Sequence, residues 1–265
     1  MKGTILEKIV EAKRFEVAAA KRSADIPALK KAAARSAVRG SHRLHKAISR
    51  KGRANIIAEF KRASPSKGVI NAGLDPAEAA VSYKNAGGAA VSVLTDEQFF
   101  KGSLQDLSAV RTAVDLPVLR KDFVIDEFQI VEAAAAGADA VLLIASVLDT
   151  DKIAAFQEIA HSCGLDAIVE VHDLEELESA AAANARIIGV NNRNLKTFDV
   201  TLDVSRELIL RRPAGSLMIS ESGITSAEEI RELGGLGFDG FLVGEALMRS
   251  GDARDELSKL CNAIG

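Results

Sequence analysis

The sequence predicts a (β/α)8 TIM barrel, an α/β fold, preceded by a helical extension at the N-terminus. Three observations predict it: eight short apolar runs, helical periodicity between successive runs, and a length that fits one barrel-sized domain. The chain has 265 residues, of which 48% are hydrophobic and 27% charged, as in globular proteins. Eight strand-helix units within about 210 residues favour a closed barrel over an open doubly wound sheet.

Each predicted strand is a short run of apolar and β-branched residues bounded by polar or glycine-containing segments. The runs occupy residues 55–60, 89–94, 116–122, 138–145, 166–171, 186–191, 216–221 and 239–244. Successive runs begin 20 to 34 residues apart, which leaves room each time for one helix and two loops. A weak internal repeat agrees with this division, because Gly87, Gly137 and Gly237 each stand at a predicted helix end, shortly before a strand.

Residues 1–54 form the predicted extension, and residues 55–265 form the barrel domain. The extension holds 15 Lys and Arg against 4 Asp and Glu, whereas the remainder holds 19 against 33. A basic arm is one feature of nucleic-acid-binding modules, but apolar residues at helical spacing favour an amphipathic extension that packs on the acidic body. Its predicted contact residues are Ile5, Ile9, Phe15 and Val17. We therefore expect no nucleic-acid partner.

Several classes of protein are excluded by what the sequence lacks. The apolar stretches are broken well before the roughly 18–20 residues that a membrane span needs, and the N-terminus has no signal-peptide core. Two cysteines, Cys163 and Cys261, build neither a disulfide framework nor a thiol metal cluster. His42 and His45 have no third metal ligand nearby in the sequence. We expect a cytoplasmic protein with no membrane partner, no metal and no organic cofactor.

Polar residues stand at the carboxyl end of five predicted strands, where barrels of this kind carry their catalytic groups. They are Glu59, Lys61, Lys121, Glu170, Asn191, Arg193 and Glu221. Because side chains alternate along a strand, Glu59 and Lys61 share the face opposite to Phe60. Solvated strand ends explain one or two of these residues but not the set. Opposite charges held close together in a partly desolvated barrel mouth have pKa values suited to acid-base catalysis.

A phosphate site is predicted in the loops after the seventh and eighth strands, its usual position in this fold. Ser222 and Gly223 precede a capping-box pattern at residues 226–229, and Gly244 precedes the last predicted helix start. Glycines allow close approach of the backbone, and helix N-termini bind anions. Ser64 and Lys67 add a hydroxyl and a cation. We therefore expect a small phosphorylated molecule as the substrate.

Six motifs, in order and at the right spacing, resemble the indole-3-glycerol phosphate synthase family. They are IAEFKRASPSKG at 57–68, LRKDF at 119–123, VEVH at 169–172, VNNRNL at 190–195, SESGI at 220–224 and FLVGEALM at 241–248. The resemblance covers essentially the whole chain. It implies conversion of 1-(2-carboxyphenylamino)-1-deoxyribulose 5-phosphate to indole-3-glycerol phosphate, with loss of carbon dioxide and water, in tryptophan biosynthesis.

The resemblance also implies catalytic roles for individual residues. Lys121 matches the general acid that protonates the ketone oxygen during ring closure, and Lys61 matches a lysine near the substrate carboxylate and phosphate. For the dehydration, we expect Glu170 to act as acid or electrostatic stabiliser and Glu59 as base. The division of acid and base roles among Lys61, Glu59 and Glu170 stays open at this stage.

The remaining site residues are expected to bind and orient the substrate. Asn191 and Glu221 orient substrate hydroxyls and the lysines, and Arg193 contacts the anthranilate carboxylate or positions its neighbours. The expected phosphate contacts are Ser64, Ser222, Gly223 and Gly244. Glu245 departs from the family, which often has a small hydroxyl residue there, so we expect its side chain to turn away.

Two other interpretations explain the sequence less well. A phosphosugar isomerase on the same barrel relies on an Asp pair or on a Cys and an Asp at strand ends, whereas the acids here are glutamates beside two lysines. A nucleic-acid module leaves that set of charges unexplained. The sequence leaves the oligomeric state and any association with other enzymes of the tryptophan pathway open.

Overall fold

The computed structural model describes residues 4–37, 40–65, 68–70, 73–195, 197–250 and 252–264. Eight parallel strands close into a barrel in the order β1-β10-β9-β8-β7-β6-β5-β4. Their bounds are β1 (Ile56–Phe60), β4 (Ala90–Leu94), β5 (Val118–Lys121), β6 (Ala140–Ile144), β7 (Asp166–Val171), β8 (Ile187–Asn191), β9 (Leu217–Glu221) and β10 (Gly240–Val243). Each strand lies inside its predicted run, so the predicted barrel is confirmed.

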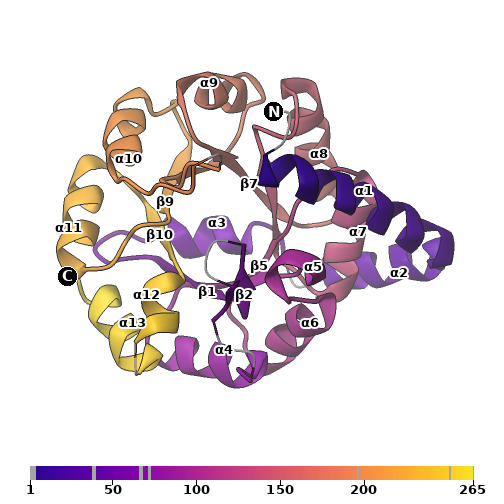
Figure 1. The fold of residues 1–265 in the computed structure, drawn as a ribbon, viewed down its shortest axis with the longest axis horizontal. Coiled ribbons are helices and arrows are strands. Elements are labelled where there is room, and N and C mark those ends of the chain that lie inside the picture. Colours follow the sequence, from indigo (N-terminus) through magenta and orange to yellow (C-terminus); the bar gives the residue numbers. More distant parts are fainter. Residues whose placement is uncertain are drawn as a thin grey trace.

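Helices surround the barrel on its outside (Figure 1). The longer ones are α4 (Pro76–Asn85), α6 (Leu104–Ala113), α7 (Glu127–Ala136), α8 (Thr150–Ser162), α9 (Leu174–Ala182), α11 (Ala227–Leu236) and α13 (Ala253–Cys261). The shorter ones are α5 (Glu97–Phe100), α10 (Asp203–Leu208), the 3-10 helix η1 (Ile209–Arg211) and α12 (Glu245–Arg249). A small hairpin of β2 (Ala63–Ser64) and β3 (Gly68–Val69) follows β1. The sequence did not predict this hairpin, because strands of two residues carry no periodicity.

The helix ends follow from local sequence. Gly137 and Gly237 adopt φ values of 96° and 117° and end α7 and α11 in the left-handed conformation that glycine adopts at little cost. The predicted capping box at the start of α11 is confirmed, with Ser226 and Glu229 bonding to each other's backbone amides. These caps fix where each helix stops and the next strand begins.

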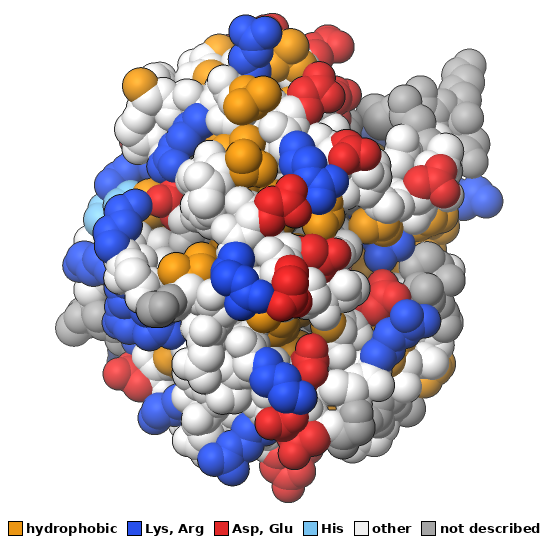
Figure 2. All heavy atoms as spheres, turned by 90° about the vertical axis from the view of Figure 1, so that its left-hand side faces the viewer, with side chains coloured by type: hydrophobic (Ala, Val, Ile, Leu, Met, Phe, Trp, Pro, Cys, Tyr) orange, Lys and Arg blue, Asp and Glu red, His pale blue; other side chains and the backbone are white. Residues whose placement is uncertain are grey.

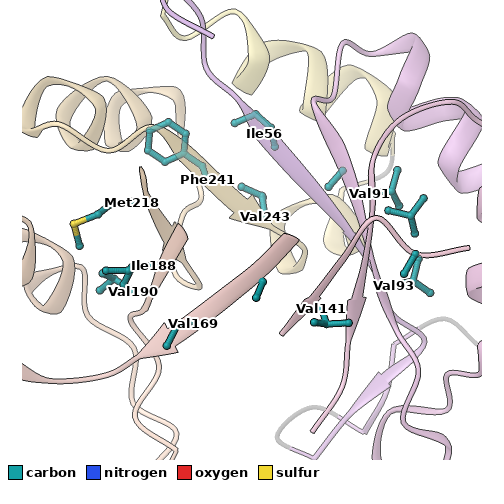
Figure 3. Packing of buried hydrophobic residues seen from close by; sticks show 14 of the residues in the cluster. Ile56, Val91, Val93, Val141, Val169, Ile188, Val190, Met218, Phe241 and Val243 are labelled. Carbon is teal, nitrogen blue, oxygen red and sulfur yellow. The ribbon is translucent and has the colours of Figure 1, made fainter. Parts of the chain in front are cut away.

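Strand alternation divides the core into two layers. Outward residues, such as Val91, Val169 and Phe241, pack between the strands and the helices (Figure 3). Inward residues, such as Ile57, Leu119 and Ile219, form a second buried cluster inside the barrel. The same alternation at the carboxyl ends of the strands turns polar side chains inward, which is what builds the site described below.

Helix α3 (Arg43–Ile48) closes the amino-terminal end of the barrel. Its Leu44 and Ile48 are fully buried members of the interior cluster. Its first turn is held by carboxylates that precede or begin strands: the His45 amide donates to Asp166 at 3.0 Å, and Arg43 pairs with Asp139 at 3.2 Å. We expected the N-terminal segment to lie outside the barrel, but α3 completes the interior core.

Helices α1 (Ile5–Ser23) and α2 (Ile26–Ala37) project beside α7 and α8 (Figure 1). The predicted docking face of α1 is only partly correct. Ile9 and Val17 are buried as expected, but Phe15 is 73% exposed. The buried stripe instead has four members, Leu6, Ile9, Lys13 and Val17. Lys13 is in register with the apolar residues of this stripe and is buried because carboxylates face it from the barrel.

The outer surface over α10, α11 and α13 mixes basic and acidic side chains, with apolar ones only in small groups (Figure 2). Exposed ion pairs such as Arg206 with Glu232 and Lys259 with Asp255 lie on these helices. Such pairs contribute little to stability individually. None of the helices in the described ranges has the length and apolar character needed to cross a membrane.

Candidate active site

Five inward-facing polar residues meet at the carboxyl ends of the strands. They are Glu59 on β1, Lys121 on β5, Glu170 on β7, Asn191 on β8 and Glu221 on β9. Each lies two residues after an apolar residue of the interior or after Gly189, so it continues the inward face of its strand. Phe60 lies in the outer core, as predicted. Except for Lys121, all of these residues are buried.

The two lysines of this region contact three of its glutamates. Lys121 Nζ lies 2.7 Å from Glu170 Oε2 and 3.2 Å from Glu221 Oε2. Lys61 Nζ lies 2.5 Å from Glu59 Oε1. Burial lowers the pKa of Lys121, but Glu170, Glu221 and Glu59 together raise it above its ordinary value. Lys121 is therefore a cation at all physiological pH values, loaded as a proton donor.

The two glutamates beside Lys121 differ in their acidity. Burial raises the pKa of both carboxyls, whereas the positive charge of Lys121 lowers both. At Glu170 the cations Lys121 and His172 prevail, so its pKa lies below the ordinary value. At Glu221 burial and the charges of Glu170 and Glu59 prevail, so its pKa rises to about 7. Glu221 Oε1 has no hydrogen-bond partner among the described residues. Two neighbouring carboxyls thus favour opposite protonation states.

Two glycines make room for these carboxylates. A Cβ atom on Gly189 of β8 would collide with Glu221 Oε1, and a Cβ on Gly244 would collide with Glu59 Oε1 and Cβ. Sequence reasoning assigned Gly244 to the phosphate and did not single out Gly189. Gly189 stands two residues before Asn191 on an inward parity, and a glycine at such a position signals a large side chain on the neighbouring strand.

A cavity joins most of the predicted site residues. Its polar lining contains Glu59, Lys61, Ser64, Lys121, Asp122, Glu170, Asn191, Arg193, Ser222 and Glu245. Glu221 lies beneath this lining, against Lys121. The predicted cation Lys67 lies outside the described residues. The structure therefore brings together eight of the predicted side chains around one space and puts Glu221 directly behind them.

The loops after β9 and β10 have the conformations expected of an anion site. Ser222 and Gly223 both have positive φ, 67° and 80°, so two consecutive residues adopt the left-handed region. Gly223 also packs tightly, because an added Cβ would collide with Val200. Ser64 lies on β2 of the hairpin and lines the same cavity as Ser222. Gly244 is the N-cap residue of the short helix α12.

Arg193 follows β8 and lies at the cavity wall. Its backbone amide donates to Asn191 Oδ1 at 3.0 Å, which fixes the Asn191 side chain. Its guanidinium pairs with Glu245 Oε2 at 3.2 Å. The expectation that Glu245 turns away is wrong, because this side chain lines the cavity and holds Arg193. An acid at the start of α12 is also favourable for the helix dipole.

Apolar side chains form the other wall of the cavity, and sequence reasoning did not identify them. They are Ile5, Leu6 and Ile9 of α1 together with Phe100, Phe123, Leu142, Ile144, Leu195 and Phe198. The rings of Phe100 and Phe123 have centroids 6.1 Å apart. The parity of Leu142 and Ile144 on β6 predicts their inward orientation, but the contribution of α1 requires the tertiary fold. The cavity is suited to a ligand with a flat apolar ring and several anionic groups.

Helix α1 is fastened beside the cavity by a buried charge network, which we call the anchor cluster. Its members are Lys13, Thr95, Asp96, Arg120, Asp122 and Glu132. Lys13 Nζ lies 2.9 Å from both Asp96 Oδ2 and Asp122 Oδ1. Burial lowers the pKa of Lys13, but Asp122 and Asp96 raise it above its ordinary value. Burial raises the pKa of Asp122, but Arg120 and Lys13 lower it to about 2.

His172 lies directly after β7 and belongs to the VEVH motif at 169–172. The sequence predicted no role for it. Its Nε2 lies 3.5 Å from Glu170 Oε1, and its Nδ1 lies 2.9 Å from Glu176 Oε2. Burial lowers the pKa of His172, but the hydrogen bond to Glu176 and the charge of Glu170 raise it above its ordinary value. Within the described ranges, no cluster of three or more His, Cys, Asp and Glu side chains has the arrangement of a metal site.

Comparison with known proteins finds relatives that match nearly the whole chain. A family model described as indole-3-glycerol phosphate synthase matches residues 6–260. Indole-3-glycerol phosphate synthases of Burkholderia ambifaria and Carboxydothermus hydrogenoformans are 45% and 47% identical to this chain, over 97% and 96% of its length and 98% of theirs. That of Bordetella pertussis is 46% identical over 97% of the chain and 98% of its own length.

Solved structures show likeness at the level of the fold. KGPDC from Streptococcus mutans has a TM-score of 0.61 at 13% identity and covers 78% of this chain and 95% of its own. Thiamine phosphate pyrophosphorylase from Pyrococcus furiosus has a TM-score of 0.58 at 20% identity and covers 78% and 93%. At these identities the likeness concerns the barrel alone.

Proposed function

Because the chain belongs to the indole-3-glycerol phosphate synthase family, we propose which of its side chains carry out the reaction of that family and how. The reaction closes the ring of 1-(2-carboxyphenylamino)-1-deoxyribulose 5-phosphate and releases carbon dioxide and water, giving indole-3-glycerol phosphate for tryptophan biosynthesis. The observation that supports the assignment best is the convergence of two lysines and three glutamates beneath a cavity with one apolar and one polar wall.

Ring closure needs an acid at the ketone oxygen, because the attacking ring carbon turns that oxygen into an alkoxide. Lys121 is the proposed acid. It is protonated, it lies on the inward face of β5, and its head group borders the cavity. Glu170 and Glu221 hold the ammonium from below, which leaves its remaining hydrogen directed at the ligand.

Lys61 is the proposed partner of the substrate carboxylate before decarboxylation. It is paired with Glu59 in the free protein and lines the cavity. Arg193, after β8, is the second proposed carboxylate contact, and Glu245 orients its guanidinium. A cation near the carboxylate binds the ground state, so its main contribution is to affinity and orientation.

Dehydration needs a proton for the departing hydroxyl and a base for the proton on the neighbouring ring carbon. We assign the acid role to Glu170 and the base role to Glu59. Glu170 is held by Lys121 and His172, and Glu59 lies on the far side of the barrel mouth next to Lys61. Asn191 and Glu221 orient the substrate hydroxyls and Lys121.

The phosphate is proposed to bind over the loops after β9 and β10. Ser64, Ser222, Gly223 and Gly244 supply hydroxyls and backbone amides, and Lys67 supplies a cation. This position is the usual phosphate site of the fold. It lies across the cavity from the apolar wall that α1 completes, so the substrate is held at both ends.

We also propose a division of the chain into an extension, residues 1–54, and a catalytic barrel, residues 55–265, in which the extension supplies part of the cavity wall. The expected setting is the cytoplasm, with a small phosphorylated substrate, without nucleic acid, without a membrane and with no metal or organic cofactor. Whether other enzymes of tryptophan synthesis bind this protein is left to experiment.

The direct test is to mix the purified protein with the carboxyphenylamino-deoxyribulose phosphate and to follow indole fluorescence. The chain has no Trp and one Tyr, so the product signal has little background. We expect product formation without added metal, and the same rate in the presence of a chelator. Absence of product would overturn the proposed function, and loss of activity on chelation that a divalent ion restores would overturn the metal-free reaction.

A further inference from the structure

The inference below rests on the proposed function. The reaction consumes and releases protons, and the active site must supply the difference. A carbon-carbon bond forms between the anilino ring and the ketone carbon, and the ketone oxygen takes one proton. The bond to the carboxylate breaks, and its electron pair returns to the ring as carbon dioxide leaves. The hydroxyl then leaves as water with a second proton, while one proton leaves the ring carbon beside the nitrogen. Each turnover therefore takes up one proton from solvent.

The acid that receives this proton is secluded. The side chain of Glu170 is 3% exposed, and Lys121 and His172 hold its pKa below the ordinary value, so the resting carboxylate carries no proton. Lys121 lies on one side of this carboxylate, at Oε2, and His172 lies on the other, at Oε1. The imidazole is therefore a titratable group within reach of Oε1, on the side of the carboxylate away from Lys121.

Hydrogen bonds to Glu176 orient the His172 ring so that it can give a proton to Glu170. Glu176 Oε2 accepts from both the His172 backbone amide, at 2.8 Å, and the ring Nδ1, at 2.9 Å. This fixes the proton on Nδ1 and turns Nε2 toward Glu170. Nε2 is buried and has no hydrogen-bond partner in the described part of the chain. The charged groups that face the ring are Glu176 of α9, Glu170 of β7 and Lys121 of β5.

A second cavity gives solvent access to this histidine. It has a volume of about 400 Å³, and its lining includes Ser146, His172, Asp173, Glu176 and Asn194. A cavity of this size and polarity holds several water molecules. It also shares Asn191 and Arg193 with the substrate cavity, so the two spaces lie on either side of the same wall.

We propose that His172 is the proton relay of this enzyme, carrying a proton from water in the second cavity to Glu170 Oε1 in each turnover. Nε2–H donates to Oε1, and the protonated Glu170 gives this proton to the departing hydroxyl. Between turnovers the neutral ring turns Nε2 toward the second cavity, where water protonates it again. His172 touches no substrate atom and acts through Glu170. Glu176 serves as the fixed counter-charge that keeps the imidazole oriented while its charge changes.

The test compares His172→Gln and His172→Ala with the wild type. Glutamine fills the space and still donates to Glu176 but carries no titrating proton. We expect turnover to fall on the order of 10-fold or more in both variants, with a much smaller change in the Michaelis constant. The wild type should lose turnover as the pH rises through the raised pKa of His172, and His172→Gln should lose this limb of the pH profile. Imidazole should restore His172→Ala in a saturable way.

His161→Gln is the matched control, because His161 is a partly buried histidine of α8 whose ring lies edge-to-face with His42 at the opposite end of the barrel. Its turnover and pH profile should equal those of the wild type. Wild-type turnover and pH profile in His172→Gln would overturn the relay and leave the proposed function standing. Lost turnover that imidazole does not restore, with an unchanged pH profile, would assign a merely structural role and overturn the relay. A wild type that forms no product overturns both.

Discussion

The anchor cluster and the ring of lysines and glutamates at the barrel mouth are both buried groups of charged residues. They meet in the sequence at β5, where Arg120 and Asp122 of the anchor cluster flank Lys121 of the mouth. In the anchor cluster every charge is compensated: Lys13 contacts three carboxylates, and both oxygens of Asp122 accept two bonds each. At the mouth, three glutamates share two lysines, and Glu221 Oε1 has no hydrogen-bond partner among the residues that the structure describes. A saturated network stabilises one structure, whereas an unsaturated one keeps capacity for a ligand.

Consecutive residues of β5 belong to the two different groups. Arg120 faces outward, 2% exposed, and joins the anchor cluster through Asp122 and Glu132. Lys121 faces inward and joins the mouth. The pleat of the strand thus directs two consecutive cations to different tasks. Burial of a charge is therefore not by itself evidence for catalysis, and incomplete compensation of that charge is the better indicator.

Loss of the lysine at the mouth should have the largest effect. Lys121→Met keeps most of the side-chain volume and removes the donor, so turnover should fall by roughly 10²-fold or more. Lys121→Arg keeps the charge but is a poor proton donor at neutral pH, so it should not restore turnover. Steady-state kinetics and melting temperatures of both variants decide this. Near-normal turnover in the Met variant, or an Arg variant close to wild type, would sink the assignment of Lys121 as the acid.

Loss of the lysine in the anchor cluster should lower stability rather than turnover. Lys13→Met leaves Asp96 and Asp122 buried with one cation fewer, so the free energy of unfolding should fall by about 3–5 kcal/mol. Turnover of the folded protein should change far less than in Lys121→Met. Glu16→Gln is the control, because Glu16 is the half-exposed partner of Lys13 and its loss should cost at most about 1 kcal/mol. Denaturant unfolding measures both, and an unchanged stability in Lys13→Met would remove the distinction between the two clusters.

The smallest expected effect concerns Glu221 and appears only as a dependence on pH. Its pKa is raised from 4.5 to about 7 in the folded protein, so the folded state binds more protons than the unfolded state within this window. The wild type should therefore lose stability as the pH rises from 4.5 to about 7.

Glu221→Gln, which resembles the protonated form, should be more stable than the wild type above pH 7, by roughly 1–3 kcal/mol, and equal to it near pH 4. Thermal unfolding at both pH values checks this, with the exposed Glu175→Gln as control. A stability difference that is the same at both pH values would contradict the raised pKa.

The strands and the mouth residues were predictable from the sequence because both depend on local patterns. Each strand lies in a short run rich in apolar residues, and the fold dictates that polar residues at the carboxyl end of such a run lie at one mouth. Glu59, Lys121, Glu170, Asn191 and Glu221 were found in this way, and the structure brings them together. Their catalytic roles are carried by the family resemblance and stay predictions.

The residues that were missed depend on partners far away in the chain. Lys13 is buried because Asp96 and Asp122 face it from two barrel loops, and no local pattern contains that information. Phe15 was assigned to the docking face for its character, although the spacing of Leu6, Ile9, Lys13 and Val17 defines a different stripe. A charged residue in register with an apolar stripe is the signal that was available.

Helix α3 closes the amino-terminal end of the barrel, and this position has a consequence for biosynthesis of the chain. Ile48 and Asn55 contact the segment around the last strand: the Asn55 side chain donates to Asp239 across a separation of 184 residues. At ribosomal rates of about 5–20 residues per second, roughly 10–40 s pass between synthesis of these two partners. The apolar face of α3 is therefore made among the first segments and covered among the last. During that interval the nascent chain carries an unburied Leu44 and Ile48, which makes β10 the element whose arrival ends its exposure to aggregation.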